Sequence, residues 1–435
     1  MILKDAFAKT PPMGWNSWDC YGSAVTENDL IKNAEFVRDN LKDCGYQYIV
    51  CDIQWYQPTA EGKNYKSFAK LCMDEYSRLI PAENRFPSSS GGKGFKPIAD
   101  RIHDMGLKFG IHIMRGIPRQ AVHSGAVTKS GIKAKDIASF DSSCDWNNDM
   151  YGVDAGKKGA QEYYDSLIEL YASWGVDFLK VDDIAYTEYA SGGEFSGKGE
   201  IEIIRKAIDK SGRSIVLSLS PGPSRLEDAF FLETNANMWR LTGDFWDKWD
   251  KLKEMFTVLE RWYTHSKPGR YPDPDMIPFG MLNVNDKNEK RESRFTKEEK
   301  ETLFSLWCIS KSPLIIGADL PQTDSDTIKL LTNKNLISID QHSEDNMPVY
   351  DDGSAVVWTC VDKNGNRVLA FFNISDGEIV IDDITKILPN INEITKNKTT
   401  AVDLLKYTKI ETEMLWKKIK IAPHSTKILT ICEQK

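Results

Sequence analysis

Up to about residue 325, short runs of mostly apolar residues alternate with longer stretches whose apolar residues recur about every three or four positions. The short runs have the character of buried strands and the longer stretches that of amphipathic helices. Eight strand-like runs occur: Met13–Trp18, Tyr46–Asp52, Lys108–Met114, Asp177–Asp182, Ser214–Ser220, Met238–Leu241, Pro274–Ile277 and Pro313–Ile316. The helical stretches include Glu27–Asp43, Ala155–Trp174, Glu200–Ser211 and Lys297–Ile309. This alternation predicts an α/β fold, a closed parallel (β/α)8 TIM barrel.

The pattern changes after about residue 330. Short β-prone runs then follow one another, with turn signals between them and few helical stretches: Ala355–Cys360, Arg367–Asn373, Gly377–Ile384, Met414–Ile421 and Ser425–Ile431. Such a series is typical of an antiparallel β-sandwich. We therefore expect two domains, a barrel over residues 1–327 and a C-terminal antiparallel β-sandwich over residues 328–435.

Charge and composition limit the classes of partner that the protein can bind. The chain has 56 Lys and Arg against 64 Asp and Glu, a net charge of -8, which disfavours nucleic acid and anionic membrane surfaces. No apolar run approaches the roughly 18 to 20 residues of a membrane span. The N-terminus lacks the residue series of a signal peptide, so we expect a cytoplasmic protein, a secreted form with its signal removed being the alternative. The eight cysteines are scattered without metal-type spacing, which favours free thiols.

Two aspartates carry the chemistry of the predicted barrel. Asp182 ends the run Val176–Asp182, and Asp244 follows Met238–Leu241. The active sites of such barrels lie at the carboxyl ends of the strands, where these side chains would meet. Cleavage of a glycosidic bond requires two carboxyl groups. The alternative is that Asp182 and Asp183 only cap the helix that follows.

Five motifs, in order, resemble glycoside hydrolase family 27, the α-galactosidases and α-N-acetylgalactosaminidases. They are Thr10–Trp18 (TPPMGWNSW), Trp174–Asp182 (WGVDFLKVD), Trp239-Arg240 with Gly243-Asp244, Pro272–Met276 (PDPDM) and Ser312–Leu320 (SPLIIGADL). The resemblance implies a catalytic barrel followed by a β-sandwich, a retaining mechanism, no metal and no organic cofactor. The partner it implies is an oligosaccharide or another glycoside.

The resemblance also assigns the two catalytic roles. It makes Asp182 the nucleophile and Asp244 the acid/base, which in retaining enzymes stand about 5–5.5 Å apart. Lys180, on the same face of its strand, would keep Asp182 ionised, whereas the pKa of Asp244 should be raised by burial or by neighbouring charge. By resemblance, Asp52 holds sugar hydroxyls.

Three further residues are candidates for substrate binding, each with a structural alternative. Arg240 would bind a hydroxyl or orient Asp244, or else form a structural ion pair. Trp15 would stack on the sugar ring, or else belong to the core. Asp275 would bind substrate, or else brace a loop.

Several positions depart from the family pattern. Where members that bind galactose usually have two adjacent aspartates, this chain has Asp52 and then Ile53, so one acceptor for a sugar hydroxyl is lost. The stretch Pro221–Pro223 replaces the loop by which family members discriminate galactose from N-acetylgalactosamine. Because Gly222 has no side chain, a ligand could approach the backbone there closely. His112 replaces a tyrosine and would contact the sugar or serve as a core histidine.

The third strand is followed by further departures. Arg115 would face the mouth of the barrel and add a positive charge there. The insertion-like stretch Arg119–Asn148 would cover part of the mouth of the barrel. Within it, Asp145 and Trp146 are candidate substrate contacts.

The leading hypothesis is that the protein is a retaining exo-acting α-glycosidase, and the favoured activity within this class is that of an α-galactosidase. The alternative is an enzyme with the same fold and mechanism that hydrolyses a related pyranoside. The candidate substrates are a β-L-arabinopyranoside, an N-acetyl-α-galactosaminide and an isomalto-type α-glucoside. The first of these has no exocyclic hydroxymethyl group to be held near Ile53. Two other classes are a non-catalytic carbohydrate-binding barrel and a metal-dependent barrel enzyme. The presence of both carboxylates argues against the first, and the lack of metal-ligand spacing among the six histidines argues against the second.

Overall fold

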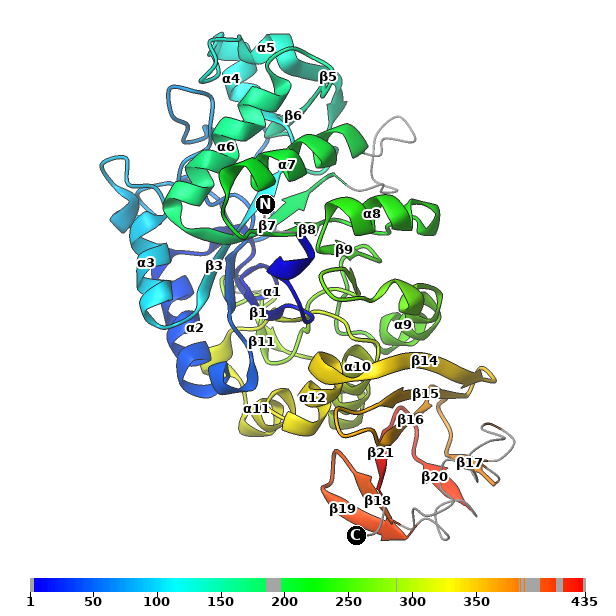
Figure 1. Ribbon diagram of the computed structural model, residues 1–435. Helices are drawn as coiled ribbons and strands as arrows, with labels where there is room; N and C mark the ends of the chain where they lie inside the picture. The colour runs from blue at the N-terminus through cyan, green and yellow to red at the C-terminus, as the bar shows by residue number, and fades with distance from the viewer. Residues whose placement is uncertain are drawn as a thin grey trace. The chain divides into compact units, whose positions relative to one another are not determined.

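The computed structural model describes residues 4–184, 197–286, 288–382, 384, 387, 400–411 and 418–432. Its first main feature is a sheet of eight strands in the order β10-β9-β8-β7-β3-β2-β1-β13 (Figure 1). The strands are β1 (Met13–Asn16), β2 (Tyr48–Cys51), β3 (Lys108–Met114), β7 (Val176–Asp182), β8 (Val216–Leu219), β9 (Met238–Arg240), β10 (Tyr271–Asp273) and β13 (Leu314–Ile316). A parallel bridge between Ile277 and Ile316 joins the two edges of the sheet. The sheet thus closes as the predicted barrel.

The strand predictions differ from the structure mainly at their ends. Pro274–Ile277 is not a strand: β10 precedes it and stops at Asp273, because Pro274 has no N–H to donate and Asp275 has a φ of 91°. The first run also ends early, since Ser17 precedes a helical turn that begins at Trp18.

Helices follow most strands and lie outside the sheet (Figure 1). Those of this part of the chain are α1 (Trp18–Tyr21), α2 (Glu27–Asn40), α3 (Lys96–Asp104), α6 (Ala160–Trp174), α7 (Lys198–Ser211) and α8 (Ala229–Asn235). Among them α2, α3 and α6 contact β2, β3 and β7. Helix α2 begins with a capping box, in which the Thr26 side chain and the Asp29 side chain each bind the other's backbone N–H.

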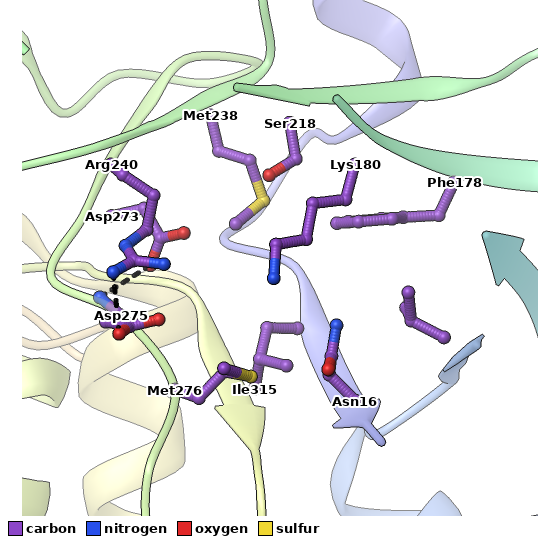
Figure 2. A pocket seen from close by; sticks show the side chains of 11 residues that line it. Asn16, Phe178, Lys180, Ser218, Met238, Arg240, Asp273, Asp275, Met276 and Ile315 are labelled. Atoms are coloured by element: carbon purple, nitrogen blue, oxygen red, sulfur yellow. Dashed lines mark hydrogen bonds and ion pairs between the residues drawn. The ribbon is translucent and has the colours of Figure 1, made fainter. Parts of the chain in front are cut away.

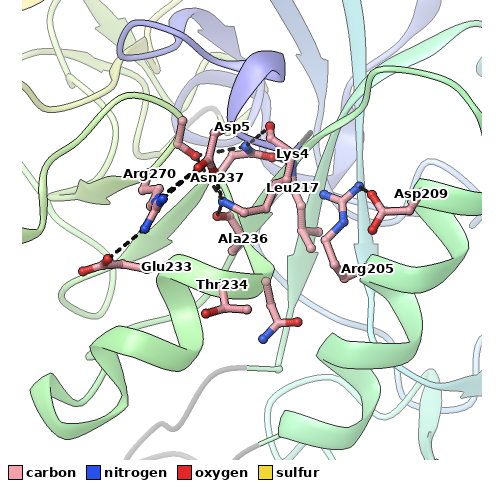
Figure 3. Close-up of polar contacts among 12 residues, drawn as sticks. Lys4, Asp5, Arg205, Asp209, Leu217, Glu233, Thr234, Ala236, Asn237 and Arg270 are labelled. Atoms are coloured by element: carbon pink, nitrogen blue, oxygen red, sulfur yellow. Dashed lines mark hydrogen bonds and ion pairs between the residues drawn. The ribbon is translucent and has the colours of Figure 1, made fainter. Parts of the chain in front are cut away.

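The N-terminal segment packs against the ends of several strands (Figure 3). Phe7 and Ala8 join an apolar cluster inside the barrel with residues of β2, β7, β8, β9 and β10. Asn237 fixes the segment: its Oδ1 accepts the N–H of Leu217 at 3.0 Å, and its Nδ2 donates to the carbonyls of Lys4 at 3.1 Å and Gly269 at 3.0 Å. These contacts involve the starts of β8, β9 and β10, so the segment forms the floor of the barrel.

The stretch after β3 is an ordered subdomain rather than a plain loop. It contains β4 (Ile117–Pro118), α4 (Arg119–Ser124), α5 (Ala134–Ile137), β5 (Ala138–Ser143) and β6 (Met150–Val153), and its strands form a sheet in the order β4-β6-β5. Asp149 connects it to the segment after β2, because its Oδ2 accepts from Gln54 at 2.8 Å and from Tyr56 at 3.0 Å.

The C-terminal part of the chain is the predicted β-sandwich. One antiparallel sheet has the order β14-β15-β16-β21-β18-β19 and the other pairs β17 with β20. Side chains of both sheets, among them Phe371, Ile381 and Ile421, form one apolar core. The strands are β14 (Glu344–Asp351), β15 (Ala355–Val361), β16 (Arg367–Asn373), β17 (Ile379–Ile381), β18 (Thr400–Asp403), β19 (Thr408–Glu411), β20 (Ile419–Ile421) and β21 (Thr426–Cys432). The sequence pattern does not predict β14, β18 or β19. Residues 414–417 of the predicted run Met414–Ile421 lie outside the described residues.

Two compact units share the chain unevenly. The first comprises Met1–Phe245, Pro268–Glu292 and Ile315–Thr323, and the second Trp246–Lys267, Ser293–Leu314 and Asp324–Lys435. The second unit also contains α9 (Trp249–Trp262), α10 (Lys297–Ile309), α11 (Ser325–Leu331) and α12 (Lys334–His342), and the first a short ribbon of β11 (Met281–Leu282) and β12 (Arg291–Glu292). The domain boundary expected at residue 327 stays a prediction, because compactness alone does not define separately folding parts. No helix in the described part of the chain has the length and apolar character that crossing a membrane requires.

Candidate active site

Three carboxylates named in the sequence analysis come together at the carboxyl ends of the barrel strands. Asp182 is the last residue of β7, Asp52 follows β2 directly and Asp244 comes shortly after β9. The phenol of Tyr65 interacts electrostatically with all three, and burial, together with these negative charges, raises its pKa. The three carboxylates therefore surround one region at the mouth of the barrel, as the strand-end argument predicted.

The carboxylate of Asp182 is buried and both of its oxygens have a hydrogen-bond partner. Nε2 of His112 lies 2.9 Å from Oδ2, and the backbone N–H of Asp183 donates to Oδ1 over 2.8 Å. Burial pushes the pKa of Asp182 upward, but the contact with His112 and the positive charge of Lys180 outweigh it, so the pKa is lowered. Asp182 is therefore ionised near neutral pH, which is the state that a nucleophile requires.

Lys180 forms its direct ion pair with Asp52. Its Nζ lies 2.8 Å from Oδ2 of Asp52, and Nδ2 of Asn16 donates to the same oxygen over 2.8 Å. Burial alone would raise the pKa of Asp52, yet the pKa is lowered because Lys180 and His112 are close. The expectation that Lys180 keeps Asp182 ionised thus holds only through its charge at a distance, since the hydrogen bond to Asp182 comes from His112.

Arg240 is buried and has Asp275 as its nearest acidic partner. Nη2 of Arg240 lies 2.7 Å from Oδ2 of Asp275 and 3.4 Å from Oδ1 of Asp244. Oδ2 of Asp275 also accepts the N–H of Phe245 over 2.7 Å, so Asp275 supports the segment that carries Asp244. The side chain of Asp244 is 47% exposed, in contrast to the buried Asp182, and is accessible to a ligand.

A small cavity of about 20 Å³ lies inside the barrel beside these groups, with space for about one water molecule. Figure 2 shows Lys180 and Arg240 pointing into it from β7 and β9, with Asn16 on another side. Along β7 the inward-facing side chains are Phe178, Lys180 and Asp182, so the cavity lies one step deeper than the candidate nucleophile. At this volume it is too small for a pyranose ring, although Lys180, Arg240 and Asp275 line both it and the region around the carboxylates.

Aromatic side chains stand beside the carboxylates, and sequence reasoning found only one of them. The rings of Trp18 and Tyr65 stack with centroids 6.2 Å apart, and those of Tyr65 and Trp146 lie 5.3 Å apart. Of the three, only Trp146 is a contact that the sequence analysis names. The position of Tyr65 in a long segment after β2 was the available signal, since such segments lie at the mouth. Trp15, in contrast, is fully buried, and its Nε1 donates to the carbonyl of Ala318 over 2.7 Å, which favours its core role.

Asp19, at the start of the chain, is a further carboxyl that sequence reasoning missed. It is buried, and burial raises its pKa to about 7, with the charge of Asp244 raising it and that of Lys63 opposing the rise. A Cβ at Gly317 would lie 2.0 Å from Oδ2 of Asp19, so a side chain at position 317 would collide with this carboxyl in its present position. Asp19 lies in no strand, and the period of the strands does not point to it.

The departures from the family pattern have definite positions in the structure. Ile53 is 1% exposed, and its N–H donates to Oδ1 of Asp52 over 2.8 Å, so an apolar side chain follows the Asp52 carboxylate directly. Gly222 is not left open to a ligand, because its N–H donates to the carbonyl of Thr242 over 2.9 Å and a Cβ there would collide with that carbonyl.

Arg115 and Asp183 also differ from expectation. Arg115 is buried rather than facing the mouth, and its Nη2 lies 2.8 Å from Oδ2 of Asp183. Asp183 does not cap α7, the next helix among the described residues, whose N-cap residue is Gly197. Within the described residues, no cluster of three or more His, Cys, Asp or Glu is arranged to hold a metal ion. All eight cysteines belong to the described part of the chain, and none of them forms a disulfide bond there.

Comparison with known proteins supports this picture. The family model described as Alpha galactosidase A matches residues 10–156 and 147–342. Alpha-galactosidase 2 of Arabidopsis thaliana is 29% identical over 342 residues, 78% of this chain and 69% of that protein. The alpha-galactosidase of Oryza sativa subsp. japonica is 25% identical over 435 residues, 99% of this chain and 86% of that protein.

Among solved structures, the crystal structure of a variant of a GH27 β-L-arabinopyranosidase from Geobacillus stearothermophilus, in complex with arabinose, is more similar. It is 46% identical, covers 100% of both chains and has a TM-score of 0.93. The predicted fold, a (β/α)8 barrel with a C-terminal β-sandwich, and the predicted enzyme class are confirmed by these likenesses. The chain belongs to glycoside hydrolase family 27, the family of the α-galactosidases, and is a glycoside hydrolase.

Proposed function

We propose that the protein is a retaining exo-glycosidase that releases a terminal pyranose of galactose configuration, with Asp182 as nucleophile and Asp244 as acid/base. The observation that carries this proposal is the contrast between the two carboxylates. Asp182 is buried, held at both oxygens and ionised, whereas the side chain of Asp244 is 47% exposed and lies 3.4 Å from Nη2 of Arg240. A nucleophile must be fixed and charged, while an acid must exchange its proton with the leaving oxygen and then with water.

The reaction proceeds in two displacements. An oxygen of Asp182 attacks the anomeric carbon while the carboxylic acid of Asp244 protonates the departing glycosidic oxygen. The product is a covalent ester between the sugar and Asp182. Asp244, now a carboxylate, takes a proton from a water molecule that attacks the same carbon and releases the sugar with its configuration retained.

Buried charged groups would bind the sugar hydroxyls around the nucleophile. Lys180 and Asp52 form one ion pair and Arg240 and Asp275 another, at 2.8 and 2.7 Å. Because each pair is already ordered, little side-chain entropy remains to be lost when a hydroxyl binds. Trp18, Tyr65 and Trp146 add ring faces suited to the apolar side of a sugar.

Within this substrate class, Ile53 favours a β-L-arabinopyranoside over an α-galactoside. The two sugars share the ring configuration, but galactose has an additional hydroxymethyl group. A hydroxyl that meets Ile53 in place of a carboxylate loses its acceptor, at a cost of about 1–3 kcal/mol, or roughly 5- to 150-fold in kcat/KM. The 46%-identical relative named a β-L-arabinopyranosidase supports this preference, and the α-galactosidase relatives support the α-galactoside as the second candidate.

The test is hydrolysis of nitrophenyl glycosides: β-L-arabinopyranoside, α-galactoside, N-acetyl-α-galactosaminide and α-glucoside. We expect the arabinopyranoside to have the highest kcat/KM, the α-galactoside to follow, and both activities to disappear in Asp182→Asn. Trapping with a 2-fluoro glycosyl fluoride should add one sugar mass to the peptide that contains Asp182. Activity that survives in Asp182→Asn, or a label on another residue, would refute the assignment.

A further inference from the structure

The residue after the candidate nucleophile has a backbone conformation that few residues adopt. Asp183 has a φ of 52°, in the left-handed region, where Asp and Asn are the most tolerated residues after Gly. Its N–H donates to Oδ1 of Asp182 over 2.8 Å. The position of this N–H depends on the path of the backbone, so whatever holds Asp183 in this conformation also places a donor against the nucleophile.

Arg115 binds this turn from three directions. Its Nε donates to the carbonyl of Asp183, and its Nη2 lies 2.8 Å from Oδ2 of the same residue. Its backbone N–H donates to the carbonyl of Asp182 over 3.0 Å, as the first residue after the pairing of β3 with β7. Arg115 is 3% exposed and Asp183 is 5% exposed, so water does not compete for these contacts.

The guanidinium of Arg115 is itself fixed from the other side. Its Nη1 lies 3.5 Å from Oε1 of Glu200, whose other oxygen accepts from the hydroxyl of Tyr164. A Cβ at Gly152 would lie 2.4 Å from Nη1, so the guanidinium occupies the space that a side chain at position 152 would need. One cation between two buried carboxylates in this packing has little freedom to move.

We propose that Arg115 is a positioning residue for the reaction, which binds Asp183 at its carbonyl and its carboxylate and so holds the Asp183 N–H against the attacking carboxylate of Asp182. This inference rests on the proposed function, because it assumes that Asp182 is the nucleophile. With one oxygen held by His112 and the other by the turn, the orientation of the carboxylate toward the anomeric carbon is fixed before substrate binds.

A matched control is present on the same strand. At the opposite end of β7, Nη2 of Arg213 lies 2.6 Å from Oδ1 of Asp177, another ion pair between an arginine and an aspartate of this region. Arg213→Met therefore measures the general effect of losing an ion pair on β7. Arg115→Met measures that effect together with any change at Asp182.

The measurement is kcat and KM on two arabinopyranosides, or on the sugar that the wild type prefers, with 4-nitrophenol and 2,4-dinitrophenol as leaving groups. The second leaving group departs without protonation, so a defect in the acid/base is relieved on it and a defect in the nucleophile is not. We expect Arg115→Met to lower kcat about 10- to 100-fold on both, with little change in KM. Arg213→Met should keep wild-type kinetics while its Tm falls.

The pH profile supplies a second readout. The groups that face Asp182 are His112 of β3, Lys180 of β7 with its partner Asp52, the adjacent Asp183, Tyr65, Arg240 and Cys144. All of them are retained in the variants. A shift of the acid limb of kcat/KM to higher pH in Arg115→Met, absent in Arg213→Met, therefore reports a weaker hydrogen bond from the Asp183 N–H to Asp182, together with the uncompensated carboxylate of Asp183 beside it.

A second pair of variants decides the matter if Arg115→Met does not fold. Asp183→Asn keeps a residue that tolerates the left-handed region, and its side-chain oxygen can still accept from Nη2 of Arg115, so it should retain most of kcat. Asp183→Ala keeps only the backbone carbonyl as acceptor and should lose it. Equal kcat in these two, or an Arg115→Met defect that disappears with dinitrophenol, would overturn the inference. If instead the wild type cleaves no sugar, the proposed function itself fails, and the two failures are thus distinguished.

Discussion

Replacing His112 with leucine removes the side-chain partner of Asp182 and fills nearly the same space. His112 is fully buried, and its Nε2 lies 2.9 Å from Oδ2 of Asp182. Leucine has no polar atom, so in the variant only the Asp183 N–H would bind the carboxylate. Glutamine places an N–H donor at a similar distance from the backbone, and His112→Gln is therefore the matched control.

The expected size of the effect follows from this one contact. A hydrogen bond to a charged group is worth about 1.5–3 kcal/mol, and 1.36 kcal/mol corresponds to one pKa unit, so the pKa of Asp182 should rise by about 1–2 units. Because its folded-state pKa is lowered, ionised Asp182 stabilises the fold above about pH 4, and this contribution disappears as the pH falls through the folded-state pKa. In the leucine variant this contribution becomes smaller.

The assay is the pH dependence of kcat/KM for the preferred aryl glycoside, whose acid limb reports the ionisation of the free enzyme's base. In His112→Leu this limb should move to higher pH by about 1–2 units, and in His112→Gln by much less. Thermal melts at pH 5 and pH 7 check that both variants are folded. An acid limb in His112→Leu identical to that of the wild type would refute the view that His112 keeps Asp182 ionised.

Three further predictions test other parts of the molecule. Ile53→Asp should raise the ratio of α-galactoside to β-L-arabinopyranoside kcat/KM by about 10-fold, because it returns an acceptor for the hydroxymethyl group, and an unchanged ratio would contradict the specificity argument. Gly317→Ala should lower kcat/KM without unfolding the protein, because the new Cβ would lie 2.0 Å from Oδ2 of Asp19 and displace that carboxyl; wild-type kinetics would show that Asp19 has no influence on the site. Asn237→Ala should cost about 2–4 kcal/mol of unfolding free energy in denaturant titrations, because it leaves the Leu217 N–H and two carbonyls without their partner, while kcat of the folded fraction stays unchanged.

The strand ends of the barrel could be predicted because their chemistry is local. The run predicted to end at Asp182 ends there in the structure, and the run Tyr46–Asp52 contains β2, which ends one residue earlier, at Cys51. Lys108–Met114 and Lys297–Ile309 were predicted with the bounds that the structure has. Long periodic segments of this kind carry their own signal.

Partners across the barrel could not be predicted from the sequence. The pairing of Lys180 with Asp52 joins residues 128 positions apart, and His112 lies 70 positions from Asp182. Trp15 and Trp18 have the same chemical character and lie three residues apart, yet one is core and the other stands at the mouth, because the strand ends between them. Tyr65 belongs to no periodic element; its long segment after β2 points to the mouth of the barrel, but the place of its ring among the carboxylates depends on the fold.

The division of the chain between its two compact units determines which part of the protein could be removed without disrupting the other. The second unit takes in α9 and α10, which lie in the chain between barrel strands, and these helices contact the sandwich closely: Trp249 stacks on His424 at 3.8 Å, and Oγ1 of Thr302 donates to the carbonyl of the same residue over 2.7 Å. A sequence cut after residue 327 would leave both helices without the sheet that covers them. Unlike a binding module joined through a linker, this β-sandwich therefore cannot be deleted at a single cut without exposing two helices of the enzyme.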